Sequence, residues 1–364
     1  MTAIMKYFIS ALFSLPICLL FITGCSSIGP RTVSNDSFDY TGALAESWKQ
    51  RMLINMVRVR YGDTPVFLDV ASVINQYSME TSGQASMEWQ SPLSSNANTF
   101  GIGGSATYID RPTITYVPLS GVKFARSLMR PLPTSAVTSM IEAGYPVDAV
   151  LRVCVESING VRNRFEGTLR QQTADVEFYP LLERLRRIQD SGAISMRVKK
   201  TDENETTILN LTGKVDASVH EDSLLVRKSL GLDPAQEEFR VVYASKATDD
   251  KEIALLTRSL LQIINNLAAD VEVPEAHLAE KFVRQIRPEI TPSGAPVPPL
   301  IKIRSSPSRP DNAFVAVPYQ TYWFWIDNRD PKSKGLFTFL MFLFSLTETE
   351  GDQGAPIVTI SAGG

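Results

Sequence analysis

Hydrophobic and polar positions alternate with two different periods along the chain, and each period predicts a type of element. From Ala43 to Arg60 apolar residues recur at helical spacing, which predicts an amphipathic helix. The runs Val66 to Gln90 and Thr99 to Val117 are rich in Val, Thr, Tyr, Ser and Ile, with turn residues from Ser91 to Asn98 between them. We expect these two runs to form long antiparallel strands with polar, partly exposed faces. A helix over Val66 to Glu80 stays open as an alternative.

The middle of the chain is mainly helical in pattern, with prolines between its segments. Helices are predicted over Gly121 to Met129, Ser135 to Ala143, Val147 to Ile158, Asp175 to Gln189 and Ser223 to Leu230. Strands are predicted over Ile194 to Lys199, Thr207 to Leu211 and Phe239 to Ala244. The clearest helical pattern covers Asp249 to Ala268, where Asp249 and Glu252 form a plausible capping box.

Five prolines between Pro288 and Pro299 indicate a linker or an extended crossing segment. Beyond them the pattern predicts strands over Leu300 to Arg304 and Ala313 to Asp327, the second bent into a hairpin around Pro318 to Thr321. Asp330 followed by Pro331 is a typical helix start, and the helix is expected to reach Leu346. A closing strand is predicted over Pro356 to Ile360.

These elements favour an α+β fold, in which antiparallel strands and hairpins pack with amphipathic helices and no internal repeat occurs. The expected organisation has five parts along the chain. They are a signal peptide (1–24), a lipidated cysteine with a short tether (25–41), a main α+β body (42–287), the Pro-rich segment (288–299), and a C-terminal strand-hairpin-helix-strand unit packed on the body (300–364).

The first 24 residues predict export. Lys6 precedes an apolar run from Tyr7 to Phe21, which is shorter than the about 20 residues of a membrane span but fits the hydrophobic region of a signal peptide. The run ends in Ile22, Thr23, Gly24 and Cys25, a sequence that resembles the lipobox of bacterial lipoproteins. The resemblance implies cleavage before Cys25 and lipid attachment to its sulfur. Ser26 follows where inner-membrane lipoproteins often carry Asp, so the outer membrane is favoured if the source is Gram-negative.

Composition agrees with an exported globular body. The chain has 44% hydrophobic and 21% charged residues, and a body of this size can bury a core without disulfides. Without Lys6 the balance is 35 basic against 39 acidic residues, too weak to imply nucleic acid as a partner. With Cys18 in the signal peptide and Cys25 lipidated, Cys154 is the remaining thiol, and its apolar surroundings favour a core residue over a nucleophile.

The densest aromatic cluster lies at Tyr322, Trp323, Phe324 and Trp325, close to Tyr319. In a strand Trp323 and Trp325 share one face, while Tyr322 and Phe324 share the other. One face belongs to the core. We favour core on both faces, but Trp323, Trp325 and Tyr322 are kept as a candidate binding surface for sugar or protein.

Other candidates for chemistry have plainer interpretations. The apolar segment Gly335 to Leu346 is too short for a span and favours buried core. Gly101 to Ala106 matches a relaxed dinucleotide fingerprint but lies in strand-like sequence. His220 and His277 belong to no metal-binding pattern, and no nucleophile elbow occurs, so no catalytic residue, metal or cofactor is predicted. The arginines at 162, 164, 184, 186 and 187 are interspersed with acids, which favours a salt-bridged face over a basic patch.

Four segments, Trp48 to Tyr61, Pro65 to Tyr77, Asp110 to Leu119 and Tyr322 to Leu346, together resemble a family of uncharacterised bacterial lipoproteins. The resemblance implies a cell-envelope address and no mechanism. We therefore expect a lipid-anchored, non-enzymatic envelope protein that binds another envelope protein or a glycan. The alternatives are a hydrolase or glycan-processing enzyme built from scattered carboxylates, and a small-ligand carrier with an apolar cavity near the aromatic hairpin.

Overall fold

The computed structural model of the protein describes most of the chain after the expected leader. Its described ranges are 30–74, 77–88, 99–110, 113–118, 120–167, 170–200, 205–211, 216–286, 289–290 and 294–348. The chain divides into two compact units, Met1–Arg51 and Met52–Gly364. The lipobox residues Ile22 to Cys25, the turn at Ser91 to Asn98 and the closing strand at Pro356 to Ile360 lie outside the described residues.

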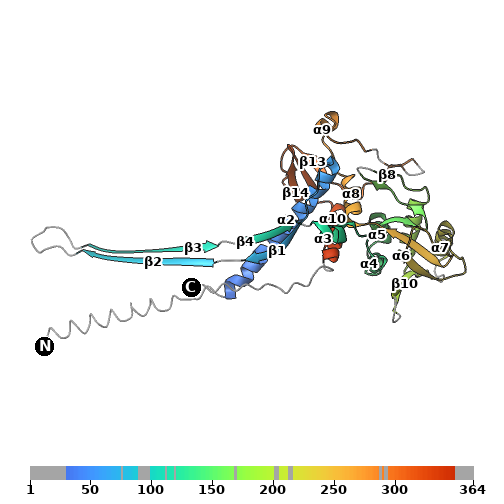
Figure 1. The fold of residues 1–364 in the computed structure, drawn as a ribbon, viewed down its shortest axis with the longest axis horizontal. Coiled ribbons are helices and arrows are strands. Elements are labelled where there is room, and N and C mark those ends of the chain that lie inside the picture. Colours follow the sequence, from blue (N-terminus) through green and yellow to red (C-terminus); the bar gives the residue numbers. More distant parts are fainter. Residues whose placement is uncertain are drawn as a thin grey trace, which may run out of the picture. The chain divides into compact units, whose positions relative to one another are not determined.

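The first described element is the helix α2 (Pro30–Tyr61), coloured blue in Figure 1. The predicted helix over Ala43 to Arg60 is confirmed, and Met56 and Val57 in its last turns are fully buried. Residues 30–40, which fall within the predicted tether, are also helical. Pro30 at the first helical position is compatible with a helix start, because its missing N–H needs no partner there.

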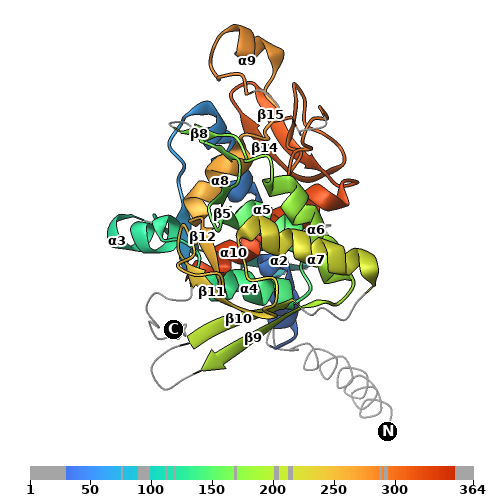
Figure 2. The ribbon, with the colours of Figure 1, turned by 90° about the vertical axis from the view of Figure 1, so that its right-hand side faces the viewer.

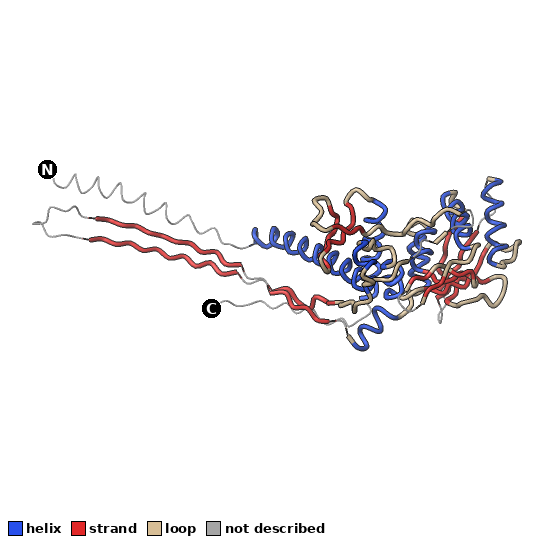
Figure 3. The backbone as a smooth tube through the Cα atoms, turned by 90° about the horizontal axis from the view of Figure 1, so that it is seen from above, coloured by secondary structure: helices blue, strands red, loops and turns tan. Residues whose placement is uncertain are grey.

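The two long β runs are confirmed as strands, and the helical alternative for Val66 to Glu80 is wrong. β1 (Leu68–Ile74) pairs with β4 (Thr113–Pro118), and β2 (Tyr77–Glu88) pairs with β3 (Thr99–Asp110). Both ladders are antiparallel, and each is a two-stranded sheet. Figure 3 shows β2 and β3 in red, running side by side over their whole length.

The predicted helices that follow are confirmed, with one exception at a helix end. They are α3 (Gly121–Phe124), a π-helical turn η2 (Ala125–Met129), α4 (Thr134–Glu142), α5 (Val147–Cys154), α6 (Phe178–Asp190) and α7 (Ala217–Leu230). Residues 155–158, predicted as the end of a helix, form strand β5 (Val155–Ile158) instead. Asn159 and Gly160 both have positive φ and turn β5 into β6 (Val161–Arg162), as two-residue hairpin turns require.

The centre of the fold is a six-stranded sheet in the order β6-β5-β12-β11-β10-β9. Its remaining strands are β9 (Ile194–Lys200), β10 (Glu205–Leu211), β11 (Glu238–Tyr243) and β12 (Glu252–Thr257). β11 and β12 are parallel, and the other neighbours are antiparallel. Figure 2 shows α5, α6 and α7 grouped beside this sheet, and their inward residues join one hydrophobic core with it.

The helix predicted over Asp249 to Ala268 is wrong in its first half. Residues 252–257 form β12, which lies between β5 and β11, and the helix α8 covers only Leu260–Ala268. A central strand buries both faces, so its continuous apolar run also satisfies a helical spacing. The capping box is real but lies ten residues later, between Ser259 and Gln262, whose side chains and backbone N–H groups bond reciprocally.

The C-terminal part of the chain forms a small sheet and a long helix. β14 (Ala313–Tyr319) and β15 (Tyr322–Asp327) make the predicted hairpin, which turns at Gln320 with positive φ. β13 (Arg304–Ser306) adds the third strand, so the strand predicted over Leu300 to Arg304 begins only at its last residue. α10 (Pro331–Glu348) starts at the Asp330 cap, which accepts from the Ser333 backbone N–H at 3.1 Å.

α10 belongs to the core, as predicted for Gly335 to Leu346. Phe337, Leu340 and Leu343 are fully buried, while Phe342 is exposed. Short strands β7 (Phe165–Glu166) and β8 (Gln171–Gln172) and the helix α9 (Glu275–Ala279) complete the described elements. The observed architecture is a mixed α+β fold with mostly antiparallel small sheets, which confirms the predicted class.

Arg258 connects the central sheet to the elements around it. Its side chain is fully buried between β12 and α8 and stacks over the Phe165 ring. The guanidinium donates to the carbonyl oxygens of Arg152 and Val153 in the last turn of α5, and to that of Arg164. The carbonyls of a helix end have no partner within the helix and carry partial negative charge, so a buried cation satisfies them. Burial lowers the pKa of Arg258 to about 10, so it stays charged at neutral pH.

We expect Arg258→Met to lower the free energy of unfolding by about 3 kcal/mol or more, because buried carbonyl oxygens lose their donor. Urea denaturation followed by circular dichroism measures the change. The control is Arg186→Met, which removes an exposed arginine paired with Asp190 at 3.0 Å and should change stability by less than about 1 kcal/mol. Equal losses in the two variants would contradict a structural role for Arg258.

Candidate functional site

The candidate binding surface at Tyr322, Trp323 and Trp325 lies on β15, the middle strand of the C-terminal sheet. Phe324 and Ile326 are fully buried, so their face of the strand is core. Trp323 and Trp325 lie on the opposite face and are only half-buried. Neither tryptophan is fully buried, so the structure does not bear out the interpretation of core on both faces.

The structure brings Trp323 and Trp325 together but separates Tyr322 from them. Tyr322 points to the core side, where its ring meets that of buried His277 edge to face, with the centroids 5.0 Å apart. His277 also contacts Tyr61, whose hydroxyl lies 2.7 Å from its Nδ1 atom. Tyr322 therefore belongs to an aromatic cluster that holds α9 against the end of α2, and not to the outer face.

Two exposed arginines accompany the two tryptophans. The guanidinium carbon of Arg304 lies 5.5 Å from the centre of the Trp325 ring, and that of Arg309 lies 5.5 Å from the Trp323 ring. Arg304 is the direct cross-strand partner of Trp325. Each stacked pair contributes roughly 0.5–1 kcal/mol at an exposed site. We call Trp323, Trp325, Arg304 and Arg309 the tryptophan–arginine face.

This face combines flat apolar rings with positive charge. The guanidinium of Arg304 lies 3.9 Å from the carboxylate of Asp327, which is a long distance for an ion pair. The Trp325 indole N–H is buried with no hydrogen-bond partner in the described structure. Such a face suits a partner with planar or ring surfaces and negative charge.

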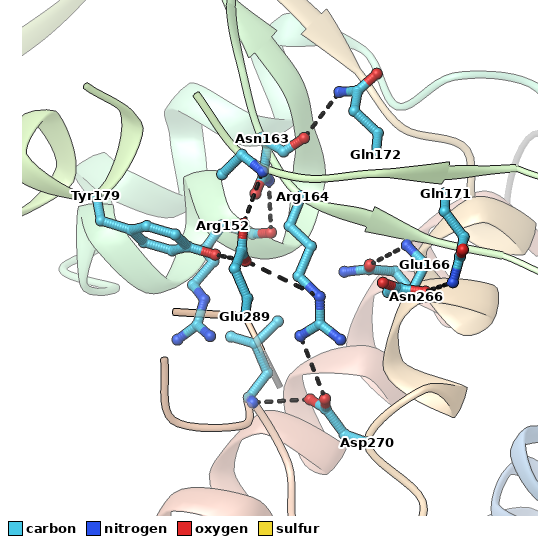
Figure 4. Close-up of polar contacts among 12 residues, drawn as sticks. Arg152, Asn163, Arg164, Glu166, Gln171, Gln172, Tyr179, Asn266, Asp270 and Glu289 are labelled. Carbon is cyan, nitrogen blue, oxygen red and sulfur yellow. Dashed lines mark hydrogen bonds and ion pairs between the residues drawn. The ribbon is translucent and has the colours of Figure 1, made fainter. Parts of the chain in front are cut away.

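A second candidate is a polar cavity of about 340 Å³. Arg60, Arg164, Asp270, Gln285 and Glu289 lie in its wall. Figure 4 shows Arg164 between the two carboxylates, with Nη1 3.7 Å from Asp270 and Nε 4.0 Å from Glu289. Two acids around one guanidinium at a cavity are the arrangement from which an acid–base pair could be built.

The hydrogen bonds of these two carboxylates also hold distant parts of the chain together. Asp270 Oδ2 accepts from the Leu300 backbone N–H at 2.8 Å. Glu289 accepts from the Ala174 backbone N–H at 2.7 Å and from the Tyr179 hydroxyl at 2.5 Å. Nearby, Arg152 donates to the Pro298 carbonyl at 2.6 Å. Together these bonds fasten the described residues Glu289, Pro298 and Leu300, at the two ends of the Pro-rich stretch, to the body.

Electrostatics agree with a fastening role. Burial raises the pKa of Asp270, and Arg164 opposes that rise. Burial and the hydrogen bond to Glu289 raise the pKa of Tyr179, which keeps the hydroxyl protonated as a donor. Each carboxylate thus holds backbone and side-chain donors in fixed positions.

The remaining candidates lie apart from both sites. Cys154 is fully buried, which confirms it as a core residue, and burial raises its pKa to about 12. Gly101 to Ala106 lie inside strand β3, so the dinucleotide interpretation fails as expected. His220 is exposed on α7. Among the residues that the structure describes, no three His, Cys, Asp or Glu side chains gather to hold a metal ion.

Four of the five arginines in the group have acidic partners among the described residues, in agreement with the prediction of a salt-bridged face. Arg162 binds Asp175, Arg187 binds Asp222, and Arg186 lies near Asp148 and Asp190. Arg164 differs from the others, because it is largely buried at the polar cavity. Its partners Asp270 and Glu289 lie more than a hundred residues away, and no sequence signal links them. Arg304 and Arg309 were also missed, although strand alternation placed the two tryptophans correctly.

Comparisons of the chain with protein-family models, with curated proteins and with solved structures give no match. In the described part of the chain, no helix has both the length and the apolar character needed to cross a membrane.

We expect Glu289→Ala to free the Pro-rich segment, because Ala174 and Tyr179 lose their acceptor. The free energy of unfolding should fall by about 2 kcal/mol, and limited proteolysis should cut between residues 280 and 300 faster. Glu280→Ala is the control, since Glu280 is exposed on the neighbouring turn. Unchanged proteolysis in Glu289→Ala would contradict the fastening role.

We expect the Cys154 thiol to resist maleimide and iodoacetamide in the folded protein, because it is inaccessible and its pKa is raised to about 12. Mass spectrometry should show labelling of Cys154 only after addition of denaturant. Rapid labelling without denaturant would contradict its place in the core.

Proposed function

We propose that this protein is a lipid-anchored, non-enzymatic component of the bacterial cell envelope that works by binding another envelope component. The attachment is the lipid on Cys25, after cleavage behind Ile22, Thr23 and Gly24. In a Gram-negative source it lies in the outer membrane and faces the periplasm. The resemblance to uncharacterised bacterial lipoproteins supports this address.

The tryptophan–arginine face carries the proposal. Two half-buried indoles and two exposed guanidinium groups share one side of a sheet whose other side is core. Stability of the sheet does not require them there, since Phe324, Ile326, Val315 and Val317 supply its buried contacts. Rings and cations on a free face are the groups that dominate binding energy at protein interfaces.

The same chemistry defines the partner. Indole rings stack on the apolar faces of sugar rings and on aromatic side chains, and arginine binds carboxylate or phosphate groups in a bidentate manner. The partner is therefore an acidic glycan of the envelope or an envelope protein with an acidic, aromatic surface.

We expect the double variant Trp323→Ala, Trp325→Ala to lose capture of its partner in living cells. The assay is photo-crosslinking from a probe amino acid at Ser306, the cross-strand neighbour of Trp323, followed by mass spectrometry. Loss of the crosslinked partner should accompany an unchanged circular dichroism spectrum. Trp48→Ala, which removes another exposed tryptophan, should leave capture intact. If the wild-type probe captures no envelope component, the binding function is refuted.

The lipid attachment at Cys25 can be tested separately from the binding face. Cells fed an alkyne-bearing fatty acid should incorporate the label into the wild-type chain and not into Cys25→Ser. An unlabelled wild-type chain would refute lipid anchoring and leave the binding face unaffected.

The second candidate is a hydrolase or glycan-processing enzyme that uses Asp270 and Glu289. Their shared contact with Arg164 at the cavity is the observation that favours it. Purified protein would then release soluble fragments from isolated cell walls, and both Asp270→Asn and Glu289→Gln would abolish release. No release by the wild-type protein removes this candidate.

A further inference from the structure

The β2–β3 hairpin leaves two long strand edges open. Each strand has 12 residues, and each pairs only with the other within the described chain. Every residue of the ladder has a partner, from Tyr77 with Asp110 to Glu88 with Thr99, with no bulge. A Cβ added at Gly83, near the middle of β2, would meet no other atom within 4 Å. A two-stranded hairpin of this kind is only marginally stable in water without further strands or a packed face.

The register divides the hairpin into two faces of opposite character. Directly paired residues lie on the same face of an antiparallel ladder. On one face the pairs are Met79 with Tyr108, Thr81 with Ala106, Gly83 with Gly104, Ala85 with Ile102, and Met87 with Phe100. On the other face they are Glu80 with Thr107, Ser82 with Ser105, Gln84 with Gly103, Ser86 with Gly101, and Glu88 with Thr99. Between Met79 and Glu88 the first set is apolar or small, and the second set is polar or glycine. The two remaining pairs, Tyr77 with Asp110 and Ser78 with Ile109, place one acid on the first face and one isoleucine on the second, at one end of the ladder.

The open edges lack the usual protection against pairing. Natural edge strands carry lysine, proline, bulges or inward charges, or are short. β2 and β3 contain neither lysine nor proline, and their charged residues are Glu80, Glu88 and Asp110. The stretch from Thr81 to Met87 is uncharged. If they were exposed to water, strands of this composition would aggregate. The composition therefore favours edges that pair with a further strand.

The dimensions match a lipid bilayer. Twelve residues at about 3.3 Å each give a strand of about 40 Å, which spans a hydrocarbon core of about 30 Å when tilted by about 40°. Aromatic positions lie towards both ends of the apolar face, at Phe100 and at Tyr108 with Tyr77. In lipid every backbone N–H and C=O must be paired within protein, so the two open edges require strand partners.

We propose that, in a lipid bilayer, the β2–β3 hairpins of neighbouring copies of this chain pair edge to edge, with their apolar faces against the acyl chains. β2 of one copy pairs with β3 of the next, which continues the antiparallel order and places like faces together. The polar faces, with Glu80 and Gln84, turn away from the lipid. The inference deepens the proposed function, because it rests on the membrane address and adds a second copy of the chain as partner.

Matched pairs of neighbouring positions test the orientation. An environment-sensitive fluorophore is attached to Ala85→Cys or to Ser86→Cys in the full mature chain, reconstituted with vesicles of phosphatidylethanolamine and phosphatidylglycerol. We expect lipid-phase quenchers to reach the probe at position 85 and not at position 86. Likewise Thr81→Arg should reduce insertion by about thirtyfold or more, as arginine does on a lipid-facing strand position, while Ser82→Arg should insert normally.

Pairing between copies is tested by mixing two chains that each carry one added cysteine, with Cys154 buried in the core. A short bismaleimide should join Ser82→Cys on β2 of one copy to Ser105→Cys on β3 of another, and only in the presence of vesicles. A mixture of Ser82→Cys with Ala276→Cys, on exposed α9, is the control and should give no product.

Any of three results overturns the inference. The first is equal quenching at positions 85 and 86, and the second is the absence of a specific crosslink in vesicles that have bound the protein. The third is crosslinks that form equally without vesicles, since they would show pairing in water. Both the acylated chain and Cys25→Ser are measured. Failure of fatty-acid labelling refutes the lipid anchor, whereas failure of the probes in a membrane-bound chain refutes only the hairpin assembly.

Discussion

The buried guanidinium of Arg258 is the interaction on which the surrounding structure depends. It lies where β12 ends and α8 begins, and its side-chain donors reach the end of α5 and the carbonyl of Arg164. Its backbone adds two more links, since its N–H donates to the Cys154 carbonyl at 2.7 Å and its carbonyl accepts from Leu132 at 3.0 Å. One residue thereby fixes a helix end, a strand and two loops. An apolar residue of the same size would pack there but would leave the Val153 and Arg164 carbonyls without this donor, whereas the Arg152 carbonyl would keep its bond from the Asn163 side chain at 2.9 Å.

The hydrogen bond from Arg258 fixes the backbone of Arg164 and so the position from which its side chain extends. With its carbonyl bound to Arg258, the side chain of Arg164 extends to Asp270 and Glu289 at the polar cavity. The two acids in turn hold the Pro-rich segment, which is followed by the β13 strand of the C-terminal sheet. The charged residues nearest the core thus form hydrogen bonds and ion pairs that hold the fold together. Arg304 and Arg309 lie at the surface instead, where they stack on tryptophans.

Much of the fold could be predicted from periodicity, and the failures have physical causes. Residues 252–257 imitate a helix because a strand buried on both faces can be apolar at consecutive positions, here from Ile253 to Leu256. The helix predicted to reach Ile158 ends at Cys154, because the Asn159-Gly160 pair favours a hairpin turn and the apolar residues before it form a strand. The tryptophan face followed from alternation alone. The polar cavity could not be predicted, since its residues come from distant segments and carry no local signature.

The hairpin shows how a pattern becomes informative only with its register. Sequence alone predicts two strands with partly exposed polar faces, and a slip of one residue would mix Met79 and Tyr108 with the polar positions. The observed ladder pairs them and so separates the faces from Met79 to Glu88, where the partners run from Tyr108 to Thr99. In this hairpin, long strand edges without protection occur together with an apolar face. Water can hydrogen-bond the backbone groups of the edges, but it does not bury the apolar face. A bilayer buries the apolar face, and a second hairpin provides hydrogen-bond partners for the edges.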